Sequence, residues 1–174
     1  MLLLKILVLV GLLVIFIQDI KSRAVYWVVF PILAISLIVL QYKTSNGLNE
    51  IWQPAIINVG FLLLQLLLLS VYFSVKNKRF INIADGLLGL GDILFLLSIT
   101  VYLSVLNFLF FYLVSLVLVL LAWIMGQSIF GKKNKHIPLA GMQSMVFIVF
   151  LSCDWLLKIV DLTDDTWLIN FIVK

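Results

Sequence analysis

Long apolar runs separated by short polar stretches dominate the chain. A membrane-spanning helix needs about 20 apolar residues, and the pattern predicts six of them. The run from 86 to 125 is too long for one crossing and has basic loops at both ends, so it is divided near residues 104–107. The last apolar run, 167–173, is too short to span and is expected to lie at the membrane interface. The six predicted spans cover residues 1–17, 24–42, 52–75, 86–104, 107–125 and 137–157.

Composition agrees with this pattern. Of the 174 residues, 64% are hydrophobic and 11% are charged, whereas about a quarter are charged in soluble domains. We therefore expect an all-α, polytopic membrane protein in which residues 1–174 form a single membrane-embedded domain. No small-x-small cleavage site follows the first run, so it is predicted to be a retained helix and not a signal peptide. The chain carries no nucleic-acid-binding signature.

The distribution of basic residues predicts the orientation. Six crossings place the first, third and fifth loops on one side of the membrane, and these loops hold eight of the twelve basic residues. The positive-inside rule puts these loops in the cytoplasm and both termini outside, in the cytoplasmic (inner) membrane. The eight residues are Lys21, Arg23, Lys76, Lys78, Arg79, Lys132, Lys133 and Lys135.

Two carboxylates are expected to share the cytoplasmic side. The first helix ends there near Asp19, and the fourth begins there with Asp92. A carboxylate carried into a bilayer costs several kcal/mol unless it is neutralised, paired or wetted, so such a residue suggests a function. Asp85 stands seven residues before Asp92, which is two turns and about 10 Å along one face of a continuous helix.

Glycines surround the second carboxylate. The sequence Gly89-Leu90-Gly91-Asp92 suggests a carboxylate on a pliable, uncrowded backbone. Packing of small residues between membrane helices is the alternative explanation for Gly86 and Gly89. It does not account for the aspartate.

Two carboxyl groups in a poorly solvated site share one proton and titrate as a pair, which suits peptide hydrolysis. Each residue also has a simpler interpretation. Asp19 could pair with Lys21 or Arg23 at a helix end, and Asp85 is a natural N-cap before Gly86. The single histidine, His136, lies in a basic loop and is interpreted as solvated and not as a catalytic base.

Cys153 is the only cysteine, so an intramolecular disulfide and a cysteine-based zinc site are excluded. No other cluster has the spacing of metal ligands. We expect no metal and no other cofactor.

These motifs resemble those of the type IV prepilin peptidases and the archaeal preflagellin peptidases, which are membrane aspartic endopeptidases of the Gly-x-Gly-Asp type. The resemblance rests on residues 19–23 (Asp-Ile-Lys-Ser-Arg) after the first helix and 89–92 at the start of the fourth. A weaker match is 137–140 (Ile-Pro-Leu-Ala) at the start of the sixth. The three motifs and the predicted order of the six spans together extend the resemblance over nearly the whole chain.

The resemblance implies cleavage, at the cytoplasmic face, of a short basic leader from pilin-like or flagellin-like precursor proteins. It implies that Asp19 and Asp92 are the catalytic pair. Gly89, Gly91 and Arg23 are implied to contact the substrate.

The sequence departs from the family pattern in three places. Residues 24–27 (Ala-Val-Tyr-Trp) follow Arg23, where the family often has x-Ile-Pro-Asn, and Leu94 stands where the family often has lysine. The cysteine-rich domain of the bifunctional members has no counterpart, so we expect neither zinc nor methyltransferase activity.

Two other functions fit the sequence. One is a small proton-coupled transporter or channel in which Asp19, Asp85 and Asp92 form a relay. We expect no matching buried polar residues in the outer half of the membrane to complete such a path, which is an argument against this function. The other is a catalytically degenerate assembly subunit. No oligomeric state is predicted.

Overall fold

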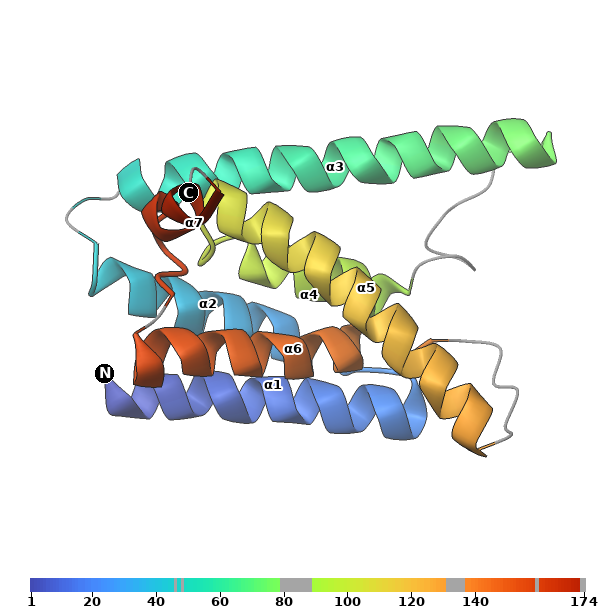
Figure 1. Cartoon of the computed structure of the whole chain (residues 1–174), viewed down its shortest axis with the longest axis horizontal. Helices are drawn as coiled ribbons and strands as arrows, with labels where there is room; N and C mark the ends of the chain where they lie inside the picture. Colours follow the sequence, from blue (N-terminus) through green and yellow to red (C-terminus); the bar gives the residue numbers. More distant parts are fainter. Residues whose placement is uncertain (46, 48, 79–88, 131–136, 159, 173–174) are drawn as a thin grey trace.

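The computed structural model describes residues 1–45, 47, 49–78, 89–130, 137–158 and 160–172 (Figure 1). The predicted all-α architecture is confirmed, because the described part folds into seven α-helices and one π-helical turn joined by short connections. The helices are α1 (Leu2–Ser22), α2 (Val29–Tyr42), α3 (Asn49–Asn77), α4 (Leu90–Ile99), α5 (Val105–Phe130), α6 (Leu139–Ser152) and α7 (Thr166–Ile172), with the π-helical turn η2 (Cys153–Leu157) directly after α6.

Four helices are long and apolar enough to cross a membrane: α1, α3, α5, and α6 together with η2. The chain is therefore a multi-pass membrane protein. The other two predicted crossings correspond to α2 and α4, which have 14 and 10 residues. At 1.5 Å per residue they are about 21 and 15 Å long, shorter than a hydrocarbon core of about 30 Å.

Helix α4 is short because its C-terminal end is fixed by contacts from other elements. The Asn58 amide on α3 donates to the carbonyls of Thr100 (3.1 Å) and Leu103 (2.8 Å). The Ser104 amide donates to the Leu162 carbonyl at 3.0 Å. Non-helical backbone is tolerated at membrane depth only where such bonds satisfy it. This segment therefore replaces the last turn predicted for the fourth span.

The predicted end of the first helix is wrong. Helix α1 continues past residue 17 to Ser22, so Asp19 lies inside the helix and not after it. It continues because Asp19 lies on the buried face of α1, among neighbouring helices. Arg23 ends the helix in a left-handed conformation (φ 53°), and its amide donates to the Asp19 carbonyl at 2.9 Å.

The second and third helices begin at other residues than predicted, and this determines where their prolines lie. Helix α2 begins at Val29 and not at residue 24, so Pro31 lies in its first turn, where a proline needs no kink. Helix α3 begins at Asn49 and not at Trp52, so Pro54 lies inside the helix instead of its first turn.

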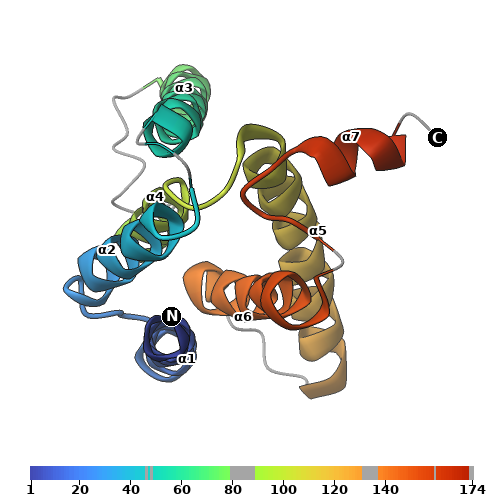
Figure 2. The ribbon, with the colours of Figure 1, turned by 90° about the vertical axis from the view of Figure 1, so that its left-hand side faces the viewer.

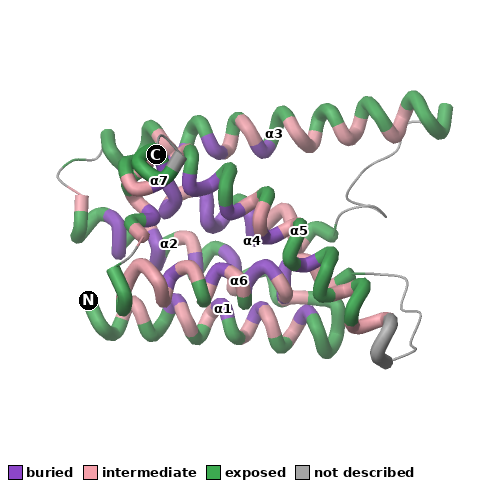
Figure 3. Tube along the Cα trace, in the orientation of Figure 1, coloured by how far each residue is buried: buried purple, intermediate pink, exposed green. Residues whose placement is uncertain are grey.

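The helices form a bundle in which α1 and α6 lie side by side, and α2 packs against both α1 and α4 (Figure 1). Helix α3 lies at the edge of the bundle, as the end-on view shows (Figure 2). Its C-terminal half is largely exposed and extends beyond the other helices (Figure 3). Most of its exposed side chains are apolar, as expected for a helix face in contact with lipid.

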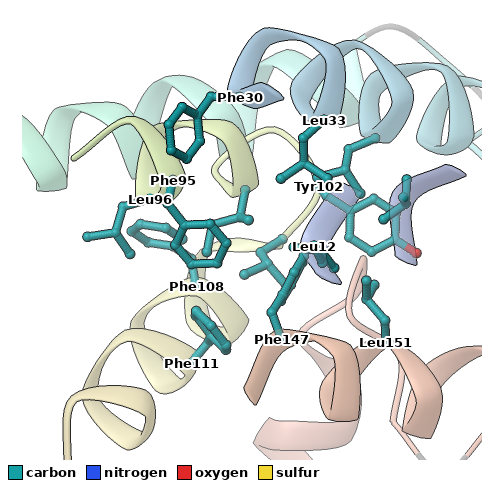
Figure 4. Close-up of a cluster of buried hydrophobic side chains, with 14 of the residues drawn as sticks. Leu12, Phe30, Leu33, Phe95, Leu96, Tyr102, Phe108, Phe111, Phe147 and Leu151 are labelled. Carbon is teal, nitrogen blue, oxygen red and sulfur yellow. The ribbon is translucent and has the colours of Figure 1, made fainter. Parts of the chain in front are cut away.

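Aromatic side chains fill the centre of the bundle (Figure 4). Phe147 on α6 contacts Phe95 on α4 and Phe111 on α5 edge to face, with ring centroids 6.4 and 5.3 Å apart. Leu12 of α1 joins the same cluster. This core holds α1, α4 and α6 in fixed positions relative to one another.

The C-terminal helix α7 packs against the beginning of α5. Trp167 lies 6.2 Å from Phe110, measured between ring centroids. Helix α7 and the start of α1 lie at the same end of the bundle (Figure 1). The side of the membrane on which the two termini lie and the interfacial location of this segment stay predictions.

Candidate active site

Asp19 belongs to the buried face of α1. Together with Val8, Leu12 and Ile15 it forms a stripe with spacings of four, three and four residues, as expected for one face of an α-helix. Asp19 is 8% exposed, and among the described residues it is the only charged side chain in the buried class. The helical period that buries the core residues also points this carboxylate into the bundle.

Asp92 lies in the first turn of α4. Gly89 precedes the helix in an extended conformation (φ −66°, ψ 141°), and its amide donates to Asp92 Oδ2 at 3.1 Å. A β-carbon on Gly89 would lie 3.2 Å from that oxygen, so glycine suits the close approach. Asp92 therefore caps its own helix, the role that the sequence suggested for Asp85, which lies outside the described residues with Gly86.

The first turn of α6 binds both carboxylates. The Ala140 amide donates to Asp92 Oδ1 at 2.7 Å, and the Gly141 amide donates to Asp19 Oδ2 at 2.6 Å. Amide nitrogens of neighbouring residues are about 3 Å apart, so the two accepting oxygens are no more than about 8 Å apart. The end of α1 and the starts of α4 and α6 thus meet at one end of the bundle (Figure 1).

The electrostatic environment of the pair is mixed. Asp19 and Asp92 repel each other as like charges, and the charge of Arg23 acts favourably on Asp19. The N-terminus of α6 adds a partial positive charge close to both carboxylates. Asp92 uses both oxygens as acceptors, whereas no described residue donates to Oδ1 of Asp19.

The other predicted site residues are less closely involved. Arg23 is exposed at the end of α1. A β-carbon on Gly91 would lie 3.8 Å from Phe30 Cζ, an ordinary contact, so space does not require glycine there. Leu94, at the position where the resembling family often has lysine, packs against the hydrophobic core. His136 lies outside the described residues.

No group of three or more His, Cys, Asp and Glu side chains within the described ranges lies close enough together to hold a metal ion. The site assembled here consists of two carboxylates and backbone amides.

Sequence reasoning missed the role of the α6 backbone. The motif at 137–140 drew attention to the start of this helix but not to Gly141. The available signal was the pair of small residues, Ala140 and Gly141, directly after Pro138 at the start of an apolar run. Small residues there allow another helix to approach closely.

Polar side chains also lie at the opposite end of the bundle. The Tyr102 hydroxyl donates to Asp154 Oδ2 at 3.2 Å and accepts from Trp155 Nε1 at 2.9 Å. Lys5 Nζ lies 4.9 Å from the centre of the Trp155 ring. These residues line a cavity of about 520 Å³. The expectation that the other half of the bundle holds no matching polar residues is therefore wrong.

Comparison of the chain with known protein families, with curated proteins and with solved structures found no match. The resemblance to the prepilin and preflagellin peptidases thus rests on the quoted motifs alone and stays a prediction.

Proposed function

We propose that this chain is a membrane aspartic endopeptidase that cleaves the short basic leader of pilin-like or flagellin-like precursors at the cytoplasmic face. One observation carries the proposal: carboxylates from two different helices converge on successive amides of a third. A purely structural acid needs only one such partner. Two neighbouring carboxylates that can share one proton are the arrangement that aspartic proteases use, and one turn of α6 binds both of them here.

The surroundings of the two acids suggest different roles. Asp92 accepts two backbone N–H groups and lies at the positive end of α4, an environment that favours its ionised form. Asp19 lies in the last turn of α1, at the negative end of that helix, and its Oδ1 has no donor among the described residues. We assign the shared proton to Asp19 Oδ1.

In the proposed reaction, water lies between the pair and the scissile carbonyl. Asp92 takes a proton from the water as its oxygen attacks the carbonyl carbon, and Asp19 donates its proton to the carbonyl oxygen. Collapse of the tetrahedral intermediate then breaks the C–N bond. The proton from Asp92 passes to the leaving nitrogen, and a hydroxyl proton of the intermediate returns to Asp19, so both acids regain their starting protonation states.

A cleavage assay in membranes tests the proposal. Candidate pilin-like precursors are incubated with the wild type, Asp19→Asn, Asp92→Asn and two controls, and the leader is followed by mobility shift. We call Asp19 and Asp92 the dyad. We expect Asp19→Asn and Asp92→Asn each to lower the cleavage rate about 100-fold or more, the scale of acid–base catalysis. Asp164→Asn, an exposed acid at the other end of the bundle, and Asp85→Asn are expected to retain cleavage.

The proposal fails if a folded, inserted Asp19→Asn or Asp92→Asn protein cleaves at the wild-type rate. Unchanged assembly phenotypes in both variants would favour the degenerate assembly subunit. The cleavage rates and assembly phenotypes of these two variants therefore distinguish a peptidase from a non-enzymatic assembly subunit.

The transporter hypothesis gains support from one observation, the polar group of Tyr102, Asp154 and Trp155 at the other end of the bundle. Together, the dyad and this polar group place ionisable side chains at both ends of the bundle. In proteoliposomes this hypothesis predicts proton flux that Asp92→Asn and Asp154→Asn each abolish. Cleavage without flux would rule it out.

A further inference from the structure

Gly141 lies closer to α1 than any residue with a side chain could. A β-carbon built on it would lie 2.9 Å from Cβ and 3.0 Å from Oδ2 of Asp19, and 3.3 Å from the Phe16 carbonyl oxygen. The first distance is shorter than carbon atoms adopt, and the last neighbour is backbone of α1, which moves only with the helix. An alanine here would push the two helices apart.

Conformation does not explain this glycine. Gly141 lies within α6 and has no left-handed φ. Gly60 on α3 and Gly126 on α5 provide the contrast, because a β-carbon on either would meet nothing within 4 Å. At position 141 the missing side chain serves the approach of α6 to Asp19.

We propose that Gly141 is a positioning residue, a role that rests on the proposed peptidase function. Without a side chain at 141, the first turn of α6 comes close enough for its amide to hold the Asp19 carboxylate beside Asp92. Because Ala140 and Gly141 are consecutive, a displacement of this turn loosens both carboxylates together. Gly141 thus sets the geometry of both acids while contacting only one of them.

The kinetic test compares Gly141→Ala with Gly60→Ala and Gly126→Ala, which add the same methyl group to open positions on other helices. Errors of about 1 Å in the placement of a catalytic group cost about 100-fold in rate. For a shift of a few tenths of an ångström we expect Gly141→Ala to lower kcat about tenfold, leave KM unchanged and displace the pH profile of kcat. The controls are expected to stay within about twofold of the wild type.

A spectroscopic test needs no substrate. The chain has nine glycines, so ¹⁵N-glycine labelling of the whole protein in detergent micelles gives a simple amide spectrum. Gly141 is assigned by adding ¹³C-carbonyl alanine, because Ala140-Gly141 is the only Ala-Gly pair in the sequence. We expect this amide proton to resonate downfield, to move with pH as Asp19 titrates, and to lose that pH dependence in Asp19→Asn.

The two tests separate failure of this inference from failure of the proposed function. A Gly141 signal that ignores Asp19→Asn overturns the positioning role, even if Gly141→Ala does not fold. Wild-type kcat in a folded Gly141→Ala protein also overturns it. If wild-type protein cleaves no precursor but the Gly141 signal depends on Asp19, the peptidase proposal fails while the geometry of the site stands.

Discussion

Asn107 joins the C-terminal segment to the start of α5, and its loss should be measurable as lost stability. The side chain is 0% exposed. Its Nδ2 donates to Ser104 Oγ (2.7 Å) and to the carbonyls of Asp161 and Asp164 (both 2.9 Å), and its Oδ1 accepts from Trp167 Nε1 (3.0 Å). Substitution of Asn107 by alanine leaves two carbonyls and one indole N–H without this partner.

The expected cost follows from these groups. Leaving a buried polar group unsatisfied costs about 1–3 kcal/mol, whereas hydrogen bonds between membrane helices average about 0.6 kcal/mol. Three groups lose this partner, and with about 1 kcal/mol for each, a value between these two figures, we expect Asn107→Ala to lower the free energy of unfolding by about 2–4 kcal/mol.

The assay is reversible unfolding in mixed detergent micelles, followed by circular dichroism. Asn170→Ala is the matched control, because it removes an exposed amide from α7. A double-mutant cycle with Trp167→Phe isolates the indole bond and should give a coupling of about 1 kcal/mol. Asn107→Ala within about 0.5 kcal/mol of Asn170→Ala would show that this network does not hold the C-terminal segment.

Three further predictions concern the helices away from the dyad. Tyr112→Phe removes the hydroxyl that accepts from Gln65 Nε2 and should destabilise the protein by about 0.5–1.5 kcal/mol in the same unfolding assay. Asn58→Ala frees two carbonyls after α4 and should cost about 2–3 kcal/mol, measured in the same way; an unchanged midpoint would contradict the account of why α4 is short. The orientation is tested in a chain whose native cysteine is replaced by alanine. Ser45→Cys should react with a membrane-impermeant maleimide added to intact cells, whereas Asn77→Cys should react only after the membrane is permeabilised. The reverse result would show that the chain has the opposite orientation.

Hydropathy predicted the helices well because apolar runs have few alternatives in a membrane. Each of the six predicted spans contains a helix, and the division of the long run near residues 104–107 coincides with the start of α5 at Val105. Helix ends were predicted less well. Asp19 and Ser22 are polar, which suggested an end, but the first faces the bundle, and tertiary burial outweighs local polarity.

The short α4 lay beyond sequence reasoning for a similar reason. Its end depends on the Asn58 amide, which reaches backbone more than 40 residues away. The local sequence of residues 100–104 does not predict this contact.

The candidate site was predictable in part. Charge distribution and helix parity placed Asp19 and Asp92 at one end of the bundle, and the structure brings them to one turn of α6. That turn itself was not predicted, because the bond from Gly141 to Asp19 joins residues 122 apart in the sequence. The two acids could be predicted from the sequence, but the backbone amides that bind them could not, because these contacts depend on how the helices pack.

The dyad variants also differ in what they do to stability, and this difference identifies the cleaner test. Asp92 caps α4, so Asp92→Asn is expected to cost some stability along with activity. Asp19 caps no helix. Its carboxylate is disfavoured by the C-terminus of α1, by burial and by the charge of Asp92, and these effects offset the favourable charges of Arg23 and of the α6 N-terminus. The amide oxygen of asparagine still accepts from Gly141. At pH 8 we therefore expect Asp19→Asn to leave the free energy of unfolding unchanged or raise it by up to about 1 kcal/mol, while leader cleavage is lost. A clear loss of stability would instead make Asp19 a structural acid, because a residue retained for catalysis at the expense of the fold should stabilise the fold when it is neutralised.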